Sequence, residues 1–390
     1  MEKVKVGLIG CGNISDIYIQ NSKNFKSYEI VACADLIRSR AEEKAEMYGI
    51  PKVCTVEEIM KDPDIEVILN LTIPQAHAEI NIKGMEAGKH VYCEKPLAVD
   101  LKDGERTMEV AKKTGLRVGC APDTFLGGRL QMCRKIVDEG WLGKIIGGTA
   151  TMLCPGHEIW HPGPDFYYKE GGGPLFDMAP YYITALLSLL GPVKQLSGTA
   201  TTTYEKREIK SEPLKGEIMD VEVPTYISAN LEFVDGAVIN CIFTFDVWDS
   251  KLPRLELYGT DGTLSVDDAD PYGGPNTFEG AIKFRTKNES DWLGSPMVLG
   301  LPRRPEATEW PRIPTLFQYN GNNRGLGLAD MTTAIRNNRE HRANGEMALH
   351  ALEVMQGIYE SARTSSFYKM KSSFTKPEPL DPNLPEYVLD

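Results

Sequence analysis

The stretch Val4-Lys5-Val6-Gly7-Leu8-Ile9-Gly10-Cys11-Gly12-Asn13-Ile14-Ser15 decides the fold. Its first half is an apolar run of strand length, and its second half has the spacing G-x-G-x-x-S. Gly10 allows a tight turn, and Gly12 lets a pyrophosphate approach the backbone because it has no side chain. Ser15 replaces the usual third glycine and is small enough for close helix–strand packing. The stretch therefore predicts a dinucleotide-binding strand–turn–helix with the phosphates at the helix N-terminus. The alternative is an ordinary strand–turn–helix.

A carboxylate follows the next predicted strand. Residues 28–34 form a second apolar strand, and Asp35 ends it, 20 residues after Ser15. At this distance a carboxylate binds the ribose hydroxyls of NAD and repels the 2′-phosphate of NADP. Arg38 and Arg40 lie close enough in sequence to weaken that repulsion. We therefore predict NAD as the cofactor, with NADP as the alternative and Arg40 among the cofactor contacts.

The composition disfavours several classes of partner. The 390 residues carry a formal net charge of −12, and nucleic acids and anionic membranes both need basic surfaces. No apolar run approaches the roughly 18 residues of a membrane-spanning helix. The eight cysteines are scattered without a C-x-x-C pair, which favours reduced thiols over disulfides or a zinc site. We therefore expect a cytoplasmic enzyme with a small-molecule substrate and no metal.

The chain shows two patterns, which predict an α/β fold with two domains. Across residues 1–122, strands alternate with helices, which predicts a Rossmann-type doubly wound parallel sheet for dinucleotide binding. Residues 123–390 contain long strands with few helices between them. They predict a substrate-binding and oligomerisation domain with a large, mostly antiparallel open sheet. We expect its strands at residues 145–153, 195–203, 225–233, 237–245, 254–258 and 262–266, and surface loops over residues 270–320. One apolar face of this sheet would need a partner, so we expect a homodimer or homotetramer.

Several motifs together resemble the Gfo/Idh/MocA oxidoreductases. They are the glycine turn, Thr72-Ile73-Pro74 with His77, Glu94-Lys95-Pro96, residues 171–177 (GGGPLFD), and residues 341–346 (HRANGE) with His350. The resemblance spans most of the chain. It implies NAD(P)-linked oxidation or reduction of a sugar, polyol or related alcohol. It also implies cofactor contacts from Gly10, Gly12, Asn13, Ile14, Asp35, Thr72, Ile73, Pro74, His77, Glu94 and Lys95.

Lys95 is the first candidate catalytic residue. It follows a predicted strand at the expected nicotinamide site, and Pro96 restricts its backbone. Hydride transfer from an alcohol needs a group that orients the hydroxyl and stabilises developing negative charge, which an ammonium can do. The alternative is a surface lysine paired with Glu94.

Asp177 and Tyr181 form the second candidate pair. Asp177 is a good helix N-cap with Pro180 in the first turn, and the i, i+4 spacing places Tyr181 on the same face. Most members of the family that this chain resembles have Asp-x-Gly-x-His here, with histidine as the acid/base, and some carry tyrosine instead. Tyrosine, with a pKa of about 10, needs a nearby cation to act as a base, and Lys95 is the candidate. Alternatively, Tyr181 is core filler and Asp177 only a cap.

Residues 157–161 match the zinc-protease motif H-E-x-x-H, which requires both histidines on one helix face. Pro155 and Pro162 flank the motif, so a full helix is implausible and a zinc hydrolase is disfavoured. We instead expect Trp160 to stack on a sugar ring and His157, His161 or Tyr168 to contact hydroxyls, although a packed loop explains these residues as well. Asp123 is a further candidate substrate contact.

The sequence therefore predicts an NAD(P)-dependent sugar or polyol dehydrogenase. Two alternatives stay open besides the hydrolase. One is a redox-neutral enzyme that modifies a glycoside through a transient keto-sugar on tightly bound NAD. The other is a non-catalytic, cofactor-sensing regulator, which the presence of Lys95 and Asp177 disfavours.

Overall fold

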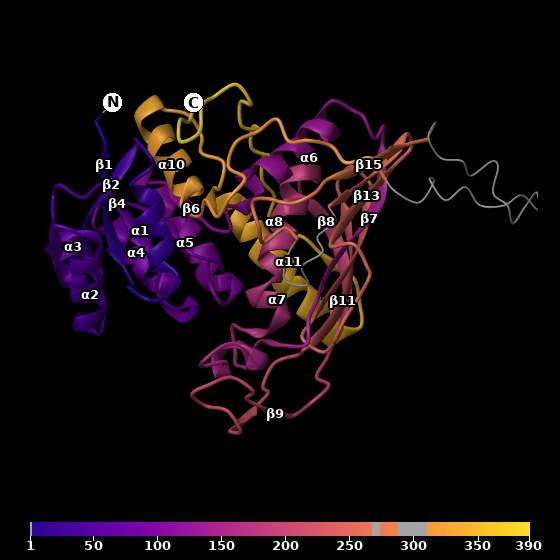
Figure 1. Ribbon diagram of the computed structural model, residues 1–390, viewed down its shortest axis with the longest axis horizontal. Coiled ribbons are helices and arrows are strands. Elements are labelled where there is room, and N and C mark those ends of the chain that lie inside the picture. The colour runs from indigo at the N-terminus through magenta and orange to yellow at the C-terminus, as the bar shows by residue number, and fades with distance from the viewer. Residues whose placement is uncertain (1, 267–273, 288–309) are drawn as a thin grey trace, which may run out of the picture.

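The computed structural model describes residues 2–266, 274–287 and 310–390. Figure 1 shows a smaller sheet near the N-terminus and a large sheet at the other side of the molecule, with helices between them. The N- and C-termini both lie near the smaller sheet. No helix in the described ranges is long and apolar enough to cross a membrane.

The first sheet is parallel throughout and has the strand order β3-β2-β1-β4-β5-β6. Its strands are β1 (Val4–Ile9), β2 (Tyr28–Ala34), β3 (Lys52–Val53), β4 (Val67–Asn70), β5 (His90–Cys93) and β6 (Val118–Cys120). Its helices are α1 (Ser15–Ser22), α2 (Arg38–Tyr48), α3 (Val56–Lys61), η1 (Pro74–Ala76), α4 (His77–Glu86) and α5 (Leu101–Thr114). Side chains from α1 and α2 share one core with β1, whereas α3, α4 and α5 contribute to a separate core. This arrangement confirms the predicted doubly wound fold.

The glycine turn after β1 has the geometry that its sequence requires. Gly10 has φ +99°, and a Cβ there would lie 2.5 Å from the carbonyl oxygen of Leu71. A side chain is therefore excluded at Gly10 on both conformational and steric grounds. A Cβ on Gly12 would meet nothing within 4 Å, so its backbone is open to an approaching ligand.

The second sheet has the strand order β15-β14-β13-β7-β12-β11-β8-β16, and only its β7–β12 pair is parallel. Its strands are β7 (Ile145–Leu153), β8 (Val193–Thr201), β11 (Tyr226–Phe233), β12 (Val238–Thr244), β13 (Leu255–Gly259), β14 (Gly262–Val266), β15 (Lys283–Thr286) and β16 (Tyr368–Lys369), and β9 (Lys206–Glu208) pairs separately with β10 (Ile218–Asp220). The predicted strands lie within two residues of these bounds, which confirms a mostly antiparallel sheet. The strand β15 falls in the region predicted as surface loop, so that prediction was wrong there; residues 288–309 of the same region lie outside the described residues.

Helices cover one face of the second sheet (Figure 1). The helical segments after β6 are η2 (Thr124–Leu126), α6 (Gly128–Asp138), η3 (His157–Ile159), η4 (Asp165–Tyr168), α7 (Gly173–Asp177), α8 (Ala179–Leu190), α10 (Leu326–Asn337) and α11 (Gly345–Thr364). Every residue of α8 is buried, because α6, α11 and the sheet surround it. The start of α8 is therefore held rigidly between the two sheets.

The other face of this sheet differs from the apolar surface that we expected. On β11 and β12 its outward positions include Ser228, Asn230 and Asn240, and the two asparagine side chains hydrogen-bond each other across the strands. Ile146 and Val238 are exposed at one end. On β11 and β12 this face therefore combines polar side chains with Tyr226, Val238 and Ile242.

One part of the second segment packs on the first sheet. In α10, Arg336 forms a bidentate ion pair with Glu66 at 2.6 and 2.7 Å. Gly327 packs closely against the Tyr92 ring, where a Cβ would meet the phenol oxygen at 2.2 Å. These contacts hold α10 against the first sheet.

Candidate active site

The carboxyl edge of the first sheet has the features of a dinucleotide site. Asp35 accepts hydrogen bonds from the backbone N–H groups of Cys11 and Ile37, both at 2.8 Å, so its carboxylate is fixed beside the glycine turn. Leu36 and Ile73 are 100% and 67% exposed at the same edge, after β2 and β4. Aliphatic side chains flanking an open glycine turn suit the flat adenine of a dinucleotide, so the residues fit this group.

The arginines after Asp35 are exposed. Arg38 donates from Nε to Glu42 at 2.8 Å, one helical turn away. Arg40 is exposed on the first turn of α2, and Asn13 is exposed in the glycine turn beside half-buried Ile14. These positions leave Asp35 as the fixed charge at the ribose end.

His77 connects two of the loops predicted to hold the cofactor. Its ring is completely buried, with Nδ1 2.6 Å from the carbonyl oxygen of Pro96 and Nε2 3.1 Å from that of Thr72. Burial lowers the pKa of His77 against the opposing effect of these carbonyls. His77 thus links the loop after β4, which contains Thr72 and Pro74, to the loop after β5. Because it is fully buried, it supports these loops from inside the protein.

Glu94 is also engaged internally. Its Oε1 accepts from the hydroxyl of Tyr18 at 2.7 Å, and its Oε2 accepts from the backbone N–H of Lys95 at 3.0 Å. The alternative of a Lys95–Glu94 side-chain pair is therefore not what the structure shows. Glu94 instead fixes the backbone from which Lys95 extends.

Lys95 is bound to Asp177. Its Nζ donates to the carbonyl oxygen of Asp177 at 2.7 Å and to Oδ1 at 2.9 Å. Both side chains are 15% exposed. Burial favours the neutral amine, but Asp177, Tyr181 and Glu94 outweigh it and hold the pKa of Lys95 above its usual value. Burial likewise opposes the charge of Asp177, and Lys95 with His157 holds the pKa of that carboxyl well below its usual range. The pair is therefore charged across the neutral range.

His157 extends this network to the surface. The indole N–H of Trp160 donates to Nδ1 of His157 at 3.2 Å, so the ring proton lies on Nε2, which donates to Oδ2 of Asp177 at 2.9 Å. The His157 side chain is only 4% exposed. Both ring nitrogens are thus engaged, and His157 orients Asp177.

The local structure at Asp177 differs from the sequence prediction. Asp177 ends the short helix α7, and Met178 precedes α8, which has no side-chain cap. The prediction of an N-cap was wrong because α7 turns the chain just before α8, and the Asp177 carboxylate is used by Lys95 and His157. Its backbone carbonyl is used by Lys95 as well.

Tyr181 lies at the start of α8, next to this network. Its side chain is 8% exposed, and Nζ of Lys95 lies 5.2 Å from its ring centroid. Arg324, just before α10, approaches the same ring with Cζ 6.0 Å from the centroid. The sequence analysis missed Arg324, because nothing near it in the sequence indicates that its loop returns to the first sheet.

Three predicted substrate contacts have other partners within the protein. Tyr168 is completely buried and donates its hydroxyl to Glu158, which also pairs with Arg207. Asp123 is 1% exposed and accepts two backbone N–H groups at the start of α10; burial raises its pKa to about 6 against those bonds. His161 is half-buried, accepts from the backbone N–H of Gly163, and packs against Trp160.

The H-E-x-x-H match does not form the helical face that zinc proteases require. Residues 157–159 form a short 3₁₀ turn, and His157 and Glu158 belong to different buried networks. Among the described residues, no group of three or more His, Cys, Asp or Glu side chains is placed to hold a metal ion.

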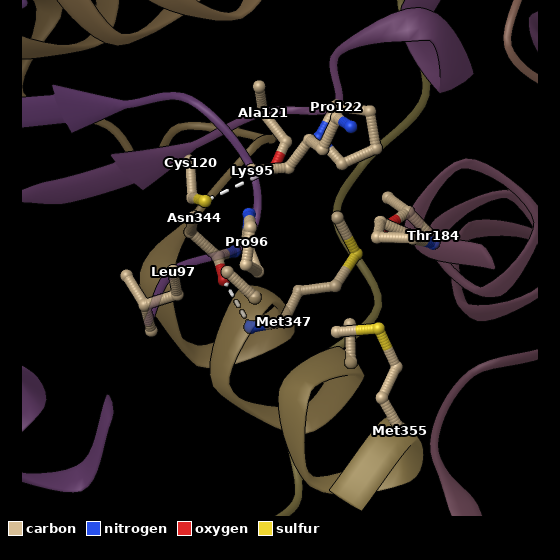
Figure 2. A pocket seen from close by; sticks show the side chains of 13 residues that line it. Lys95, Pro96, Leu97, Cys120, Ala121, Pro122, Thr184, Asn344, Met347 and Met355 are labelled. Atoms are coloured by element: carbon tan, nitrogen blue, oxygen red, sulfur yellow. Dashed lines mark hydrogen bonds between the residues drawn. The ribbon is translucent and has the colours of Figure 1, made fainter. Parts of the chain in front are cut away.

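An apolar pocket lies behind Lys95, between the two sheets. Figure 2 shows Met347 and Met355 of α11 extending toward the space between Lys95, Pro96 and Thr184. The lysine stem thus has an apolar surrounding, while its ammonium is bound by Asp177.

Comparison with known families agrees with this architecture. The model of an oxidoreductase family with an NAD-binding Rossmann fold matches residues 4–121, and the model of the GFO/IDH/MocA C-terminal domain matches residues 130–265. The chain belongs to the GFO/IDH/MocA family of oxidoreductases. Its first sheet is thus an NAD-binding Rossmann domain, as predicted.

Three distant relatives are each similar over most of the chain. The myo-inositol 2-dehydrogenase of Thermotoga maritima is 25% identical over 272 residues, which are 68% of this chain and 75% of that enzyme. An NAD-binding oxidoreductase of Klebsiella pneumoniae has the same fold, with a TM-score of 0.78 and 19% identity over 94% of this chain and 98% of that one. The aldose–aldose oxidoreductase of Caulobacter crescentus, solved with glycerol, has a TM-score of 0.74 and 22% identity over 95% of this chain and all of that one.

Proposed function

We propose that this protein transfers a hydride between NAD and a hydroxyl or keto group of a sugar, glycoside or polyol. The observation that carries the proposal is the Lys95 ammonium at the carboxyl edge of the NAD-binding sheet. An ammonium has three N–H donors, and Asp177 accepts two of them. One donor is therefore left for the oxygen of a substrate.

In this proposal Lys95 and Tyr181 have different roles at the reacting oxygen of the substrate. Bound NAD supplies the hydride acceptor. Lys95 holds the substrate oxygen and stabilises the negative charge that develops on it. Tyr181, whose ring lies 5.2 Å from the Lys95 ammonium, takes the hydroxyl proton. Asp177 orients the Lys95 ammonium through a hydrogen bond, and His157 orients the Asp177 carboxylate in the same way.

The aromatic loop supports a carbohydrate as substrate. Trp160 and Phe166 are 51% and 54% exposed, and Trp160 hydrogen-bonds the ring that orients Asp177. Exposed aromatic faces next to a polar centre suit the apolar face of a sugar ring. The myo-inositol 2-dehydrogenase and aldose–aldose oxidoreductase relatives act on compounds of this class by their names. We propose Trp160 and His161 as substrate contacts.

Cofactor preference follows from Asp35. Its carboxylate is fixed by two backbone donors and cannot turn away from a 2′-phosphate without losing both bonds. The proposal is therefore NAD over NADP. We also propose a cytoplasmic homodimer or homotetramer that uses the outer face of the second sheet, which helices leave uncovered (Figure 1). Light scattering tests the assembly, and a monomer at micromolar concentration would contradict it.

The experiment that tests the function is a substrate panel. Purified protein is incubated with NAD and with inositols, aldoses, glycosides and acyclic polyols, and NADH absorbance is followed alongside product analysis. The proposal expects NADH formation with at least one compound, and its loss in Lys95→Ala. Product formation without net NADH would instead indicate the redox-neutral glycoside chemistry. NAD binding with no conversion of any compound would indicate a regulator.

A further inference from the structure

Tyr181 is approached by two cations. Lys95 approaches its ring from the loop after β5, and Arg324 approaches it from the loop before α10, with Cζ 6.0 Å from the centroid. Arg324 also donates from Nη1 to Oδ1 of Asn322 at 2.9 Å. Tyr181 therefore has a lysine and an arginine beside its ring.

The two cations differ in how far their charge is already neutralised. Lys95 pairs with the Asp177 carboxylate at 2.9 Å. Arg324 has no carboxylate within ion-pair distance among residues 2–266, 274–287 and 310–390. A guanidinium also stays protonated over the whole working pH range. Arg324 is thus the permanent and less neutralised positive charge next to Tyr181.

The backbone of Arg324 is held in place from both domains. Its carbonyl accepts from the side chain of Asn21 in α1 at 2.8 Å. Oδ2 of Asp123 accepts the backbone N–H groups of Gly325 and Gly327 at 2.9 and 3.0 Å. Gly325 has φ +97°, a conformation that favours glycine. Asp123, expected from the sequence to contact substrate, instead fixes the loop that presents Arg324.

The charged and titratable groups around Tyr181 come from several elements. Lys95 and Arg324 are the cations, Asp177 of α7 lies behind Lys95, and Glu94 acts on both cations. Tyr167 of η4 is the neighbouring phenol, and burial raises its pKa above the usual value, so it stays protonated. Burial opposes the charge of Arg324, but Tyr181 and Glu94 hold its pKa above the ordinary value.

We propose that Arg324 is a positioning residue for proton transfer, which stabilises the phenolate of Tyr181 that accepts the substrate proton. This inference rests on the proposed function. In the step, the substrate O–H bond breaks and a bond forms between its proton and Oη of Tyr181. The electron pair of that O–H bond becomes the second bond of the carbonyl, and the C–H electron pair leaves with the hydride to NAD. The positive charges of Arg324 and Lys95 offset the negative charge on Oη before transfer.

The experiment compares Arg324→Met with Arg324→Lys, and uses Arg106→Met, an exposed residue on α5, as the matched control. The first readout is ultraviolet titration of phenolate, taken as the difference between each protein and the same protein carrying Tyr181→Phe. We expect the titration midpoint of Tyr181 to rise by about one pH unit or more in Arg324→Met, and less in Arg324→Lys. Arg106→Met should leave it unchanged.

The second readout is the pH profile of kcat/KM for alcohol oxidation. Arg324→Met should lose about tenfold per unit of that shift at neutral pH and recover at higher pH. An unchanged midpoint and profile, or a loss confined to NAD affinity, would overturn the inference. A moved midpoint without turnover of any compound would refute the proposed function while upholding the role of Arg324.

Discussion

The cofactor edge and the cluster around Lys95, Asp177 and Tyr181 are built in different ways. At the cofactor edge, the glycine turn and Asp35 lie within 35 residues of the N-terminus, and backbone N–H groups hold the carboxylate. In the cluster, side chains from residues 95, 157, 177, 181 and 324 meet through bonds between distant parts of the chain. The cofactor edge is therefore encoded by nearby residues, whereas the cluster forms only when distant segments fold together. Variants in each region should therefore separate affinity from rate.

The largest expected effect is that of Lys95→Ala. It removes the ammonium from the reacting oxygen, so kcat should fall by roughly 10²- to 10⁴-fold, and NAD affinity should change little. Steady-state kinetics with the best substrate of the panel measures this. Lys102→Ala, an exposed lysine on α5, is the control and should keep normal turnover. A comparable fall of kcat in both variants would mean that Lys95 has no specific role in catalysis.

Tyr181→Phe tests whether the hydroxyl of Tyr181 contributes to turnover. It keeps the ring and its packing while deleting the hydroxyl, so we expect kcat to fall by roughly 10²-fold with stability unchanged. Tyr182→Phe is the control because Tyr182 is completely buried and points about 100° away around α8. Near-normal turnover of Tyr181→Phe would exclude it as the base. His161 would then be the candidate base, because Lys95 is already protonated and both nitrogens of His157 are engaged.

Asp177→Asn should act on stability with a defined pH dependence. It leaves the half-enclosed Lys95 charge without its partner, which costs about 3 kcal/mol in the free energy of unfolding at neutral pH. Because the folded-state pKa of Asp177 is lowered, its contribution is complete above the unfolded value of about 3.9. It is lost as the pH falls through the folded value.

Denaturant titrations between neutral and strongly acidic pH check this window. The difference between wild type and Asp177→Asn should shrink only in acid. Asp64→Asn breaks an exposed pair with Lys5 and should cost at most about 1 kcal/mol at any pH. Equal costs for the two variants would show that the Lys95–Asp177 pair behaves as a surface pair.

The smallest expected effect is at the cofactor edge. Asp35→Ser removes the charge that repels a 2′-phosphate, so the NADP/NAD ratio of kcat/KM should rise by about tenfold or more. The saturated rate with NAD should stay near normal, because Asp35 lies at the ribose end. Kinetics with both cofactors measures the ratio. If the unmodified protein uses NADP as well as NAD, the preference assigned to Asp35 is wrong.

The sequence predicted the parts of this molecule that depend on local pattern. The glycine turn, the parallel sheet apart from its short strand β3, and the second sheet apart from β15 and β16 follow from short-range periodicity and turn chemistry. The position of Tyr168 in a buried network could not be predicted. Its hydroxyl donates to Glu158, and Arg207, which pairs with Glu158 and lies over the Tyr168 ring, comes from a separate hairpin. Arg324 could not be predicted for the same reason. It lies 229 positions after Lys95 in the sequence, and the two side chains come near each other only at the ring of Tyr181.

The two-region account is tested most directly by measuring NAD dissociation constants and single-turnover hydride-transfer rates on Asp35→Ala and Lys95→Ala together. We expect one variant to lose NAD affinity and the other to lose hydride-transfer rate. Asp35→Ala should weaken NAD binding by about tenfold or more and keep the saturated rate near normal, whereas Lys95→Ala should lower that rate by at least about 10²-fold with NAD affinity retained. Parallel losses of affinity and rate in both variants would contradict it.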